Sequence, residues 1–131
     1  MAVKLALDTN AYVEMARGNH LIQKAVCEAD TVALTFISLA ELRSGFRGGL
    51  KEAENERALQ RFLNQPGIET IFPDEQTVHH YAVLYNQLRK QGTPIPTNDL
   101  WIAALVREHD LVLLSFDNHF KHLGQLPRLK I

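Results

Sequence analysis

The sequence predicts an α/β fold in which a mainly parallel sheet is sandwiched by helices. Short apolar runs alternate along the chain with longer amphipathic segments, and this alternation is typical of parallel sheets. The chain has 131 residues, which is enough for one domain and too few for two ordinary ones. We therefore expect a single domain covering residues 1–131.

Five segments are predicted strands. Four are short apolar or β-branched runs of the length expected for a buried strand. The fifth lies in the C-terminal tail, where Pro127 restricts it to the edge of the sheet. In chain order the predicted strands are residues 3–7, 31–36, 69–72, 111–114 and 126–131.

The segments between the strands show apolar residues at helical spacing. Asp74 is the expected N-cap of the fifth helix, which ends before Gly92, and Thr97 is the expected N-cap of the sixth. The predicted helices are residues 10–17, a segment around 21–26, 37–46, 51–63, 74–91 and 97–109, followed by a short helical turn at 117–122. The expected buried stripe of the fifth helix is Val78, Tyr81, Ala82, Tyr85 and Leu88.

Composition is that of an ordinary globular protein, with 46% hydrophobic and 22% charged residues. The net charge of −1 gives no bulk basic field, although a cluster of acids would mask basic residues elsewhere. A single cysteine, Cys27, excludes an internal disulfide and fits a reducing cytoplasm. No apolar run reaches the roughly 18 residues of a membrane helix, and no secretory signal is recognisable. We therefore expect a cytoplasmic protein with no membrane partner.

Four carboxylates follow predicted strands or lie near the start of predicted helices. Asp8 comes directly after the first strand, Glu41 lies in the helix after the second, Asp99 opens the sixth helix, and Asp117 follows the fourth strand. Ligands of open parallel sheets collect at the carboxyl ends of the strands. Carboxylates that lie close together repel unless a cation neutralises them, and Mg²⁺ prefers oxygen ligands. The pattern therefore predicts a divalent-metal site, which is suited to hydrolysis of a phosphate ester.

Each of these acids also has a purely structural interpretation. Asp8 is a favoured N-cap for the helix that follows it. Glu41 matches a Ser-x-x-Glu capping box that begins at Ser38. Asp99 suits the positive end of a helix dipole, and Asp117 suits an Asx turn after a strand. The sequence leaves these interpretations open.

Other catalytic motifs are missing from the sequence. The histidines form no His-Glu-x-x-His pattern, and with one cysteine they make a poor zinc site. There is no Gly-x-Ser-x-Gly elbow and no phosphate-binding glycine loop. Two alternatives to a nuclease remain. One is a haloacid-dehalogenase-like phosphatase with Asp8 as nucleophile, although Asn10 stands where that class has a second Asp. The other is a non-catalytic binding module.

Four stretches resemble the motifs of PIN-domain nucleases. Their order, their spacing and the chain length are similar to the VapC toxins of type II toxin–antitoxin systems, and the resemblance covers nearly the whole chain. The segment around Asp99 is its most specific part. The four stretches are Leu7-Asp8-Thr9-Asn10, Ser38-Leu39-Ala40-Glu41-Leu42, Pro96-Thr97-Asn98-Asp99-Leu100-Trp101-Ile102-Ala103-Ala104 and Leu114-Ser115-Phe116-Asp117-Asn118-His119-Phe120.

The resemblance implies a three-layer α/β/α sandwich and an endoribonuclease that depends on Mg²⁺ or Mn²⁺. It also implies a homodimer and a cognate VapB-type antitoxin that blocks the site. Such a toxin inhibits translation and growth until its antitoxin binds.

The resemblance further assigns roles to individual residues. Asp8 and Asp99 would be the principal metal ligands, and Glu41 would complete the catalytic cluster directly or through water. Asp117 corresponds to a fourth acid that varies within the family. The polar supporting positions correspond to Thr9, Asn10 and Ser115.

An RNA substrate needs cations along its backbone. Arg43 and Arg47 lie one helical turn apart just beyond Glu41 and are candidate phosphate contacts. Further candidates are Arg89, Lys90 and Lys121.

Overall fold

The computed structural model describes residues 2–129, and these form one all-parallel sheet with helices on both faces. The strand order is β3-β2-β1-β4-β5. Each neighbouring pair of strands is parallel, as the sequence predicted. The strands are β1 (Lys4–Leu7), β2 (Thr31–Thr35), β3 (Ile68–Ile71), β4 (Val112–Leu114) and β5 (Arg128–Leu129).

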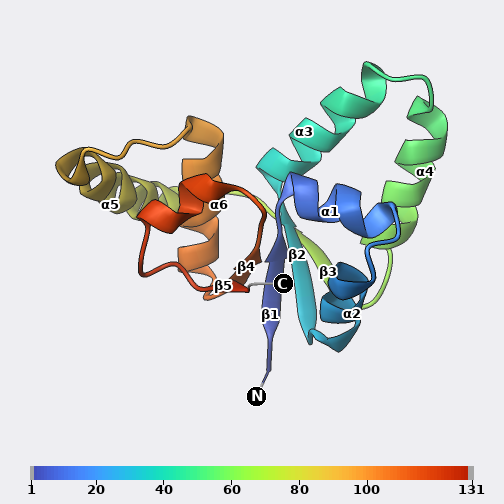
Figure 1. Cartoon of the computed structure of the whole chain (residues 1–131), viewed down its shortest axis with the longest axis horizontal. Helices are drawn as coiled ribbons and strands as arrows, with labels where there is room; N and C mark the ends of the chain where they lie inside the picture. Colours follow the sequence, from blue (N-terminus) through green and yellow to red (C-terminus); the bar gives the residue numbers. More distant parts are fainter. Residues whose placement is uncertain (1, 130–131) are drawn as a thin grey trace.

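The helices form two outer layers, which confirms the three-layer sandwich. Helices α5 and α6 cover one face of the sheet, and α1 to α4 lie on the other side (Figure 1). The helices are α1 (Thr9–Ala16), α2 (His20–Glu28), α3 (Phe36–Arg47), α4 (Glu52–Leu63), α5 (Glu75–Gln91), α6 (Thr97–Glu108) and the 3₁₀ helix η1 (Asn118–His122). Among residues 2–129, no helix is long and apolar enough to cross a membrane.

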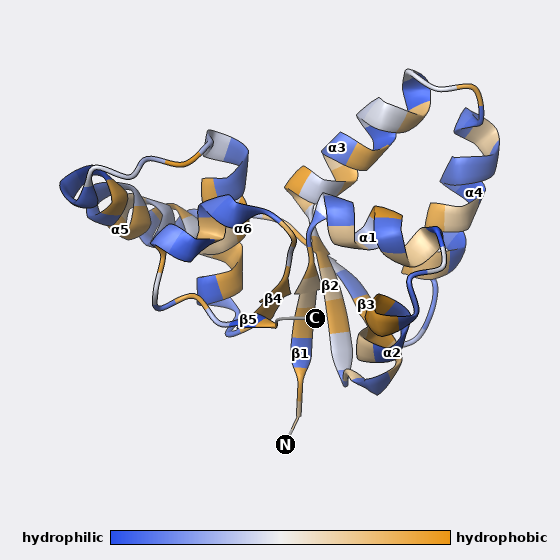
Figure 2. Cartoon of the chain, in the orientation of Figure 1, coloured by the Kyte–Doolittle hydropathy of each residue, from blue (hydrophilic) through white to orange (hydrophobic). Residues whose placement is uncertain are grey.

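The central strands are apolar on both sides because each side meets a helical layer (Figure 2). On β1, Leu5 and Leu7 face the core shared with α1, α2 and α4, whereas Ala6 faces the core shared with α5 and α6. Ala33 of β2 lies on the same side as Ala6. These two small residues meet Ala103 and other small side chains of α6 in one buried cluster, so that α6 packs close to the sheet.

The chain order creates a switch point at the centre of the sheet. Strands β1, β2 and β3 proceed outward in one direction, and the chain then returns to place β4 on the other side of β1. Leu7 at the end of β1 is level with Leu34 of β2 and Leu114 of β4. In open parallel sheets, ligands bind at the carboxyl ends of the strands beside such a switch point. Asp8 follows β1 and Ser115 follows β4, so both stand at this position.

Two predicted helix starts are wrong. Helix α3 begins at Phe36, because Thr35 at the end of β2 accepts a hydrogen bond from the backbone N–H of Ser38 and acts as the N-cap. Ser38 therefore lies inside the first turn and does not begin a capping box with Glu41. In α6 the N-cap position belongs to Pro96, with no side-chain cap, and Thr97 is already helical.

The predicted buried stripe of α5 is wrong in part. Leu88 is buried as predicted, and Tyr81 packs partly buried against the core that contains α6. Val78, Ala82 and Tyr85 are exposed, whereas Thr77 and Leu84 are buried. Thr77 is buried although it is polar, because its hydroxyl bonds Asp74 in a capping box and reaches Glu108 of α6. Thr77 and Leu84 therefore take the buried positions that apolarity alone assigned to their neighbours Val78 and Tyr85.

Candidate active site

Asp8 is both the N-cap of α1 and a buried acid at the switch point. Its Oδ1 accepts a hydrogen bond from the backbone N–H of Ala11 at 2.8 Å, and its Oδ2 accepts one from Ser115 Oγ. The side chain is almost fully buried. Burial raises its pKa above the ordinary value, the charges of Asp117 and Glu41 raise it further, and the two hydrogen bonds oppose this rise. The capping role and a role in a charged site therefore coexist.

Ser115 links Asp8 to Asp117. Its hydroxyl donates to Asp8 and accepts a hydrogen bond from the backbone N–H of Asp117 at 2.9 Å. A hydroxyl can do both, because it has one donor and two acceptor lone pairs. Ser115 thus fixes the chain after β4 against the chain after β1.

We expect Ser115→Ala to lower the free energy of unfolding by about 1–3 kcal/mol, because a buried carboxylate oxygen and a backbone N–H lose a partner together. Urea unfolding of the metal-free protein measures the change. Ser44→Ala, the same substitution on the exposed side of α3, is the matched control and should have little effect. Equal stability of the two variants would contradict the proposed link.

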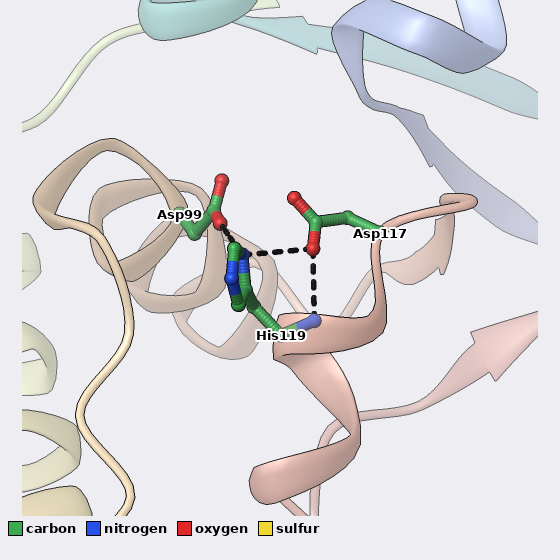
Figure 3. Close-up of side chains that lie close together, drawn as sticks. All are labelled: Asp99, Asp117 and His119. Atoms are coloured by element: carbon green, nitrogen blue, oxygen red, sulfur yellow. Dashed lines mark hydrogen bonds and ion pairs between the residues drawn. The ribbon is translucent and has the colours of Figure 1, made fainter.

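Asp99, Asp117 and His119 form a compact cluster (Figure 3). Asp99 lies in the first turn of α6, Asp117 is the N-cap of η1, and His119 lies within η1. His119 Nδ1 is 2.8 Å from Asp99 Oδ2 and 2.8 Å from Asp117 Oδ1. The His119 backbone N–H also donates to Asp117 Oδ1 at 2.8 Å. Within residues 2–129 this is a group of three side chains whose ligand atoms lie within 4.8 Å of one another.

The charges of this cluster act on each other. Burial raises the pKa of Asp99, the nearby Asp117 adds to that rise, and the hydrogen bond to His119 opposes it. The hydrogen bond to Asp99 raises the pKa of His119, and both carboxylates favour its protonated ring. The two acids thus concentrate negative charge at one place, which favours a bound cation.

Glu41 is held at the edge of the same site. Thr9 Oγ1 donates to its Oε1 at 2.5 Å, and Asn98 Nδ2 lies 3.4 Å from its Oε2. Thr9 is the neighbour of Asp8, and Asn98 is the neighbour of Asp99, so Glu41 is attached to the segments that carry both acids. Its charge also contributes to the raised pKa of Asp8. Glu41 is exposed, which leaves its carboxylate accessible to a substrate.

The structure thus brings the four predicted acids to one end of the sheet. The charge of Asp117 raises the pKa of both Asp8 and Asp99, so it is electrostatically linked to each of them. Asn10 is exposed in the first turn of α1. The assignment of Asp8 and Asp99 as the metal ligands remains a prediction.

Sequence reasoning missed two residues, His119 and Asn98. His119 was set aside because the sequence offers no zinc motif, yet its position two residues after Asp117 places it beside that acid when a short helical turn follows. Asn98 immediately precedes Asp99, and its amide points to Glu41, which is 57 positions away along the chain. Such a long-range contact leaves no local signal in the sequence.

The donor set fits a hard divalent cation. Oxygen atoms of the Asp99 and Asp117 carboxylates lie close together beside a nitrogen of His119, and Mg²⁺ and Mn²⁺ favour carboxylate ligands. Burial raises the pKa of both Asp8 and Asp99, and the charge of Asp117 adds to each rise, so their ionised forms call for compensating positive charge. A cation with two positive charges would supply that compensation.

The two candidate phosphate contacts are both ion-paired to α4. Arg43 makes a bidentate pair with Glu56, with nitrogen–oxygen distances of 3.0 and 3.1 Å. Arg47 lies 3.7 Å from Glu52, and its side chain is 82% exposed. Arg43 therefore connects α3 to α4, whereas Arg47 is held loosely and is the freer cation of the two.

A groove of about 500 Å³ runs beside the site, between α1, α3 and α4. Thr9 and Glu41 lie at its polar end, and Tyr12, Val13 and Phe46 supply apolar walls. The groove therefore leads from an apolar surface directly to the catalytic candidate Glu41.

An all-parallel α/β sheet with clustered acids at its switch point defines the class to which this chain belongs. The family model described as "PIN domain" matches residues 5–126, a range that includes all four acids.

Named relatives identify the group within that class. The chain is 32% identical over 113 residues to "Ribonuclease VapC1" of Haemophilus influenzae strain R2866, covering 83% of each chain. It superimposes on a chain of the VapBC-1 structure from nontypeable Haemophilus influenzae with a TM-score of 0.86 and 28% identity over 98% of both chains. It also resembles VapBC-5 of Mycobacterium tuberculosis, from "the VapBC family of toxin-antitoxin systems", with a TM-score of 0.78 and 26% identity, covering 98% of this chain and 99% of the other. This protein belongs to the PIN domain family and, within it, to the VapC group.

Proposed function

We propose that this protein is a Mg²⁺- or Mn²⁺-dependent endoribonuclease and the toxin of a VapBC-type toxin–antitoxin system. One observation carries the proposal, namely that Asp8, Glu41, Asp99 and Asp117 meet at one sheet edge in a member of the VapC group. The expected consequence of activity is inhibition of translation and growth until an antitoxin binds.

In this proposal the aspartates hold the cation near the switch point, where the positive charge would attract the substrate phosphate. A bound Mg²⁺ or Mn²⁺ would polarise the scissile phosphate and lower the pKa of a water molecule. Asp99 and Asp117 provide oxygen ligands from two different elements, and Asp8 adds a third carboxylate from the end of β1. Ser115 keeps Asp8 oriented towards this position.

Glu41 is the proposed acceptor of the proton from the attacking water. Its carboxylate is exposed and is oriented by Thr9 and Asn98. The water oxygen forms a bond to phosphorus while the bond from phosphorus to the 3′ oxygen breaks. The leaving 3′ oxygen takes a proton from solvent, so the cleavage leaves a 5′-phosphate on one fragment and a 3′-hydroxyl on the other. We expect Glu41→Gln to keep most of the stability of the protein, because Glu41 caps no helix. The same variant should lose most of the cleavage rate, because an amide cannot accept the proton of the attacking water.

Arg47 is the better candidate for contact with the RNA backbone, because its ion pair is longer and its side chain is exposed. We expect Arg47→Ala to weaken RNA binding and to lower the dependence of log Kd on log salt concentration by roughly 0.7. Titration of a catalytically inactive variant with labelled RNA at several salt concentrations measures this slope. Lys24→Ala, which removes an exposed cation paired with Glu28 within α2, is the control. An unchanged slope for Arg47→Ala would contradict the contact.

The proposed protein partner is a VapB-type antitoxin. Structures of related chains are described as VapBC, and VapBC-5 belongs to a toxin–antitoxin family. The groove between α1, α3 and α4 offers apolar walls that end beside Glu41. An antitoxin segment in this groove would cover the acids. We also propose that the protein acts in the cytoplasm and that it forms a homodimer. Analytical ultracentrifugation of the purified chain tests the homodimer.

Cleavage of total cellular RNA by the purified protein tests the proposal. The reactions contain EDTA, Mg²⁺ or Mn²⁺, and the new 5′ ends are mapped by sequencing. Discrete cuts that require metal would support the ribonuclease and identify its substrate. Release of phosphate from small phosphoesters, without cuts in RNA, would favour the phosphatase alternative with Asp8 as nucleophile. No cleavage by folded, antitoxin-free protein under any metal would favour the binding module.

A further inference from the structure

His119 is the one histidine whose ring lies within the acidic site (Figure 3), as far as residues 2–129 are concerned. Its Nδ1 is equally distant from Asp99 Oδ2 and Asp117 Oδ1, at 2.8 Å from each. A single ring N–H cannot make two strong hydrogen bonds. One nitrogen therefore lies 2.8 Å from each of two carboxylate oxygens, an arrangement that a single N–H satisfies incompletely.

The local backbone holds this nitrogen in place. Asp117 accepts a hydrogen bond from the backbone N–H of His119, so that the acid and the histidine are fixed on one turn of η1. The next residue, Phe120, is buried in the core and anchors the turn. About half of the His119 side chain is exposed, so a cation can reach the ring from solvent. The fold thus determines the position of Nδ1, while the His119 ring remains accessible from solvent.

The separations match those of neighbouring ligands on one small cation. When ligand atoms lie at the octahedral distances of a small divalent ion, adjacent ligand atoms are about 3 Å apart. The two nitrogen–oxygen distances of 2.8 Å are close to that value. A neutral imidazole can present the Nδ1 lone pair to a cation in place of the N–H.

We propose that His119 Nδ1 is a ligand of the divalent cation held by Asp99 and Asp117, and that this nitrogen makes the site prefer Mn²⁺ to Mg²⁺. The inference rests on the metal site in the proposed function and adds a nitrogen ligand to its carboxylates. Carboxylates suit both ions, whereas an imidazole ligand favours the transition metal, because first-row transition ions bind nitrogen donors better than Mg²⁺ does. A site with this nitrogen ligand therefore selects Mn²⁺ over Mg²⁺, which a site made of carboxylate oxygens alone would not do.

Pulsed electron paramagnetic resonance of bound Mn²⁺ tests the ligand directly, because a coordinated imidazole nitrogen modulates the electron spin echo. We expect this nitrogen signal in the wild-type protein, its loss in His119→Gln and its retention in His122→Gln. His122 is the matched control, since it lies at the end of the same turn. The sample is kept near pH 8, because the ring nitrogen can bind a cation only in its unprotonated form, and the carboxylates beside His119 favour the protonated ring. This measurement does not require RNA cleavage.

Calorimetric titration with each metal tests the selectivity. Loss of a partner that only orients a metal ligand already lowers metal affinity by roughly 10–100-fold. Loss of a direct ligand should cost at least as much, so His119→Gln is expected to weaken Mn²⁺ binding by at least ~10-fold. Mg²⁺ binding should change much less, and the preference for Mn²⁺ should shrink. His122→Gln should leave both affinities unchanged.

The results separate this inference from the proposed function. Bound Mn²⁺ without a nitrogen signal in the wild-type protein would overturn the ligand role and leave the metal site intact. Tighter binding of both metals by His119→Gln would also overturn it, because the histidine would then compete with the cation. Failure of every variant and the wild-type protein to bind either metal would overturn the metal site itself.

Discussion

Replacing Asp8 with asparagine is expected to lower the rate of RNA cleavage by at least ~10³-fold without unfolding the protein. A metal ion contributes several kcal/mol to the stabilisation of transition-state charge, and each ~1.4 kcal/mol is a factor of ten in rate. The amide removes a negative charge from the site but keeps an oxygen for the cap. Because Asn is as good an N-cap as Asp, the hydrogen bond from Ala11 is retained.

The choice of asparagine matters because Asp8 has a structural role. Alanine at this position would lose the cap and cost about 1 kcal/mol, so a loss of activity would have two causes. Removal of the charge also relieves repulsion from Asp117 and Glu41, which raises the pKa of Asp8 in the wild-type protein. The Asn amide nitrogen takes the place of Oδ2 and cannot accept from the Ser115 hydroxyl, although it can donate to Ser115 Oγ. With the repulsion relieved, the metal-free Asp8→Asn variant should unfold at a urea concentration close to that of the wild-type protein.

Asp74→Asn is the matched control for this experiment. It makes the same chemical change at another helix N-cap, that of α5, where the carboxylate bonds Gln76 and Thr77 and lies outside the acid cluster. Cleavage by Asp74→Asn should stay close to that of the wild-type protein. Wild-type rates from purified Asp8→Asn would exclude this acid from the site.

The sequence predicted the parallel sheet and the positions of the acids because these depend on local patterns. The apolar strand ending in Asp8 and the turn after Asp117 are visible without any long-range information. Parallel strands then bring their carboxyl ends to one edge, so acids far apart in the chain meet there. The clustering of the four acids followed from this rule and from the resemblance to PIN-domain nucleases.

Features that depend on side chains from distant elements were not predictable. The capping box of Ser38 and Glu41 satisfies the local pattern, but Thr35 is nearer the strand end and takes the N-cap. In α5, the polar residue Thr77 occupies a place in the buried stripe, because Glu108 of α6 accepts a hydrogen bond from its hydroxyl. His119 reaches Asp99 across 20 positions of sequence, and its role depends on the turn that η1 makes.

Phe120→Ala is expected to lower the free energy of unfolding by about 3–5 kcal/mol, the usual range for truncating a buried aromatic side chain. Phe120 is 1% exposed and lies in the core cluster shared with Leu113, Leu123 and α6. It is also the residue that attaches η1 to the body of the protein, directly after His119. Truncation should therefore loosen the turn that holds Asp117 and His119 in addition to creating a cavity.

Phe116→Ala provides the matched comparison, because Phe116 belongs to the same segment but is 47% exposed. Its effect on stability should stay within about 0.5 kcal/mol. Urea unfolding of the metal-free proteins measures the difference, and calorimetric titration with Mn²⁺ shows whether the site is lost as well. If Phe120→Ala were folded and bound Mn²⁺ as tightly as the wild-type protein, the acids would not depend on the packing of η1. A weaker Mn²⁺ affinity in folded Phe120→Ala, with Phe116→Ala unchanged, is the expected result, because the ligands are positioned by the core beneath them.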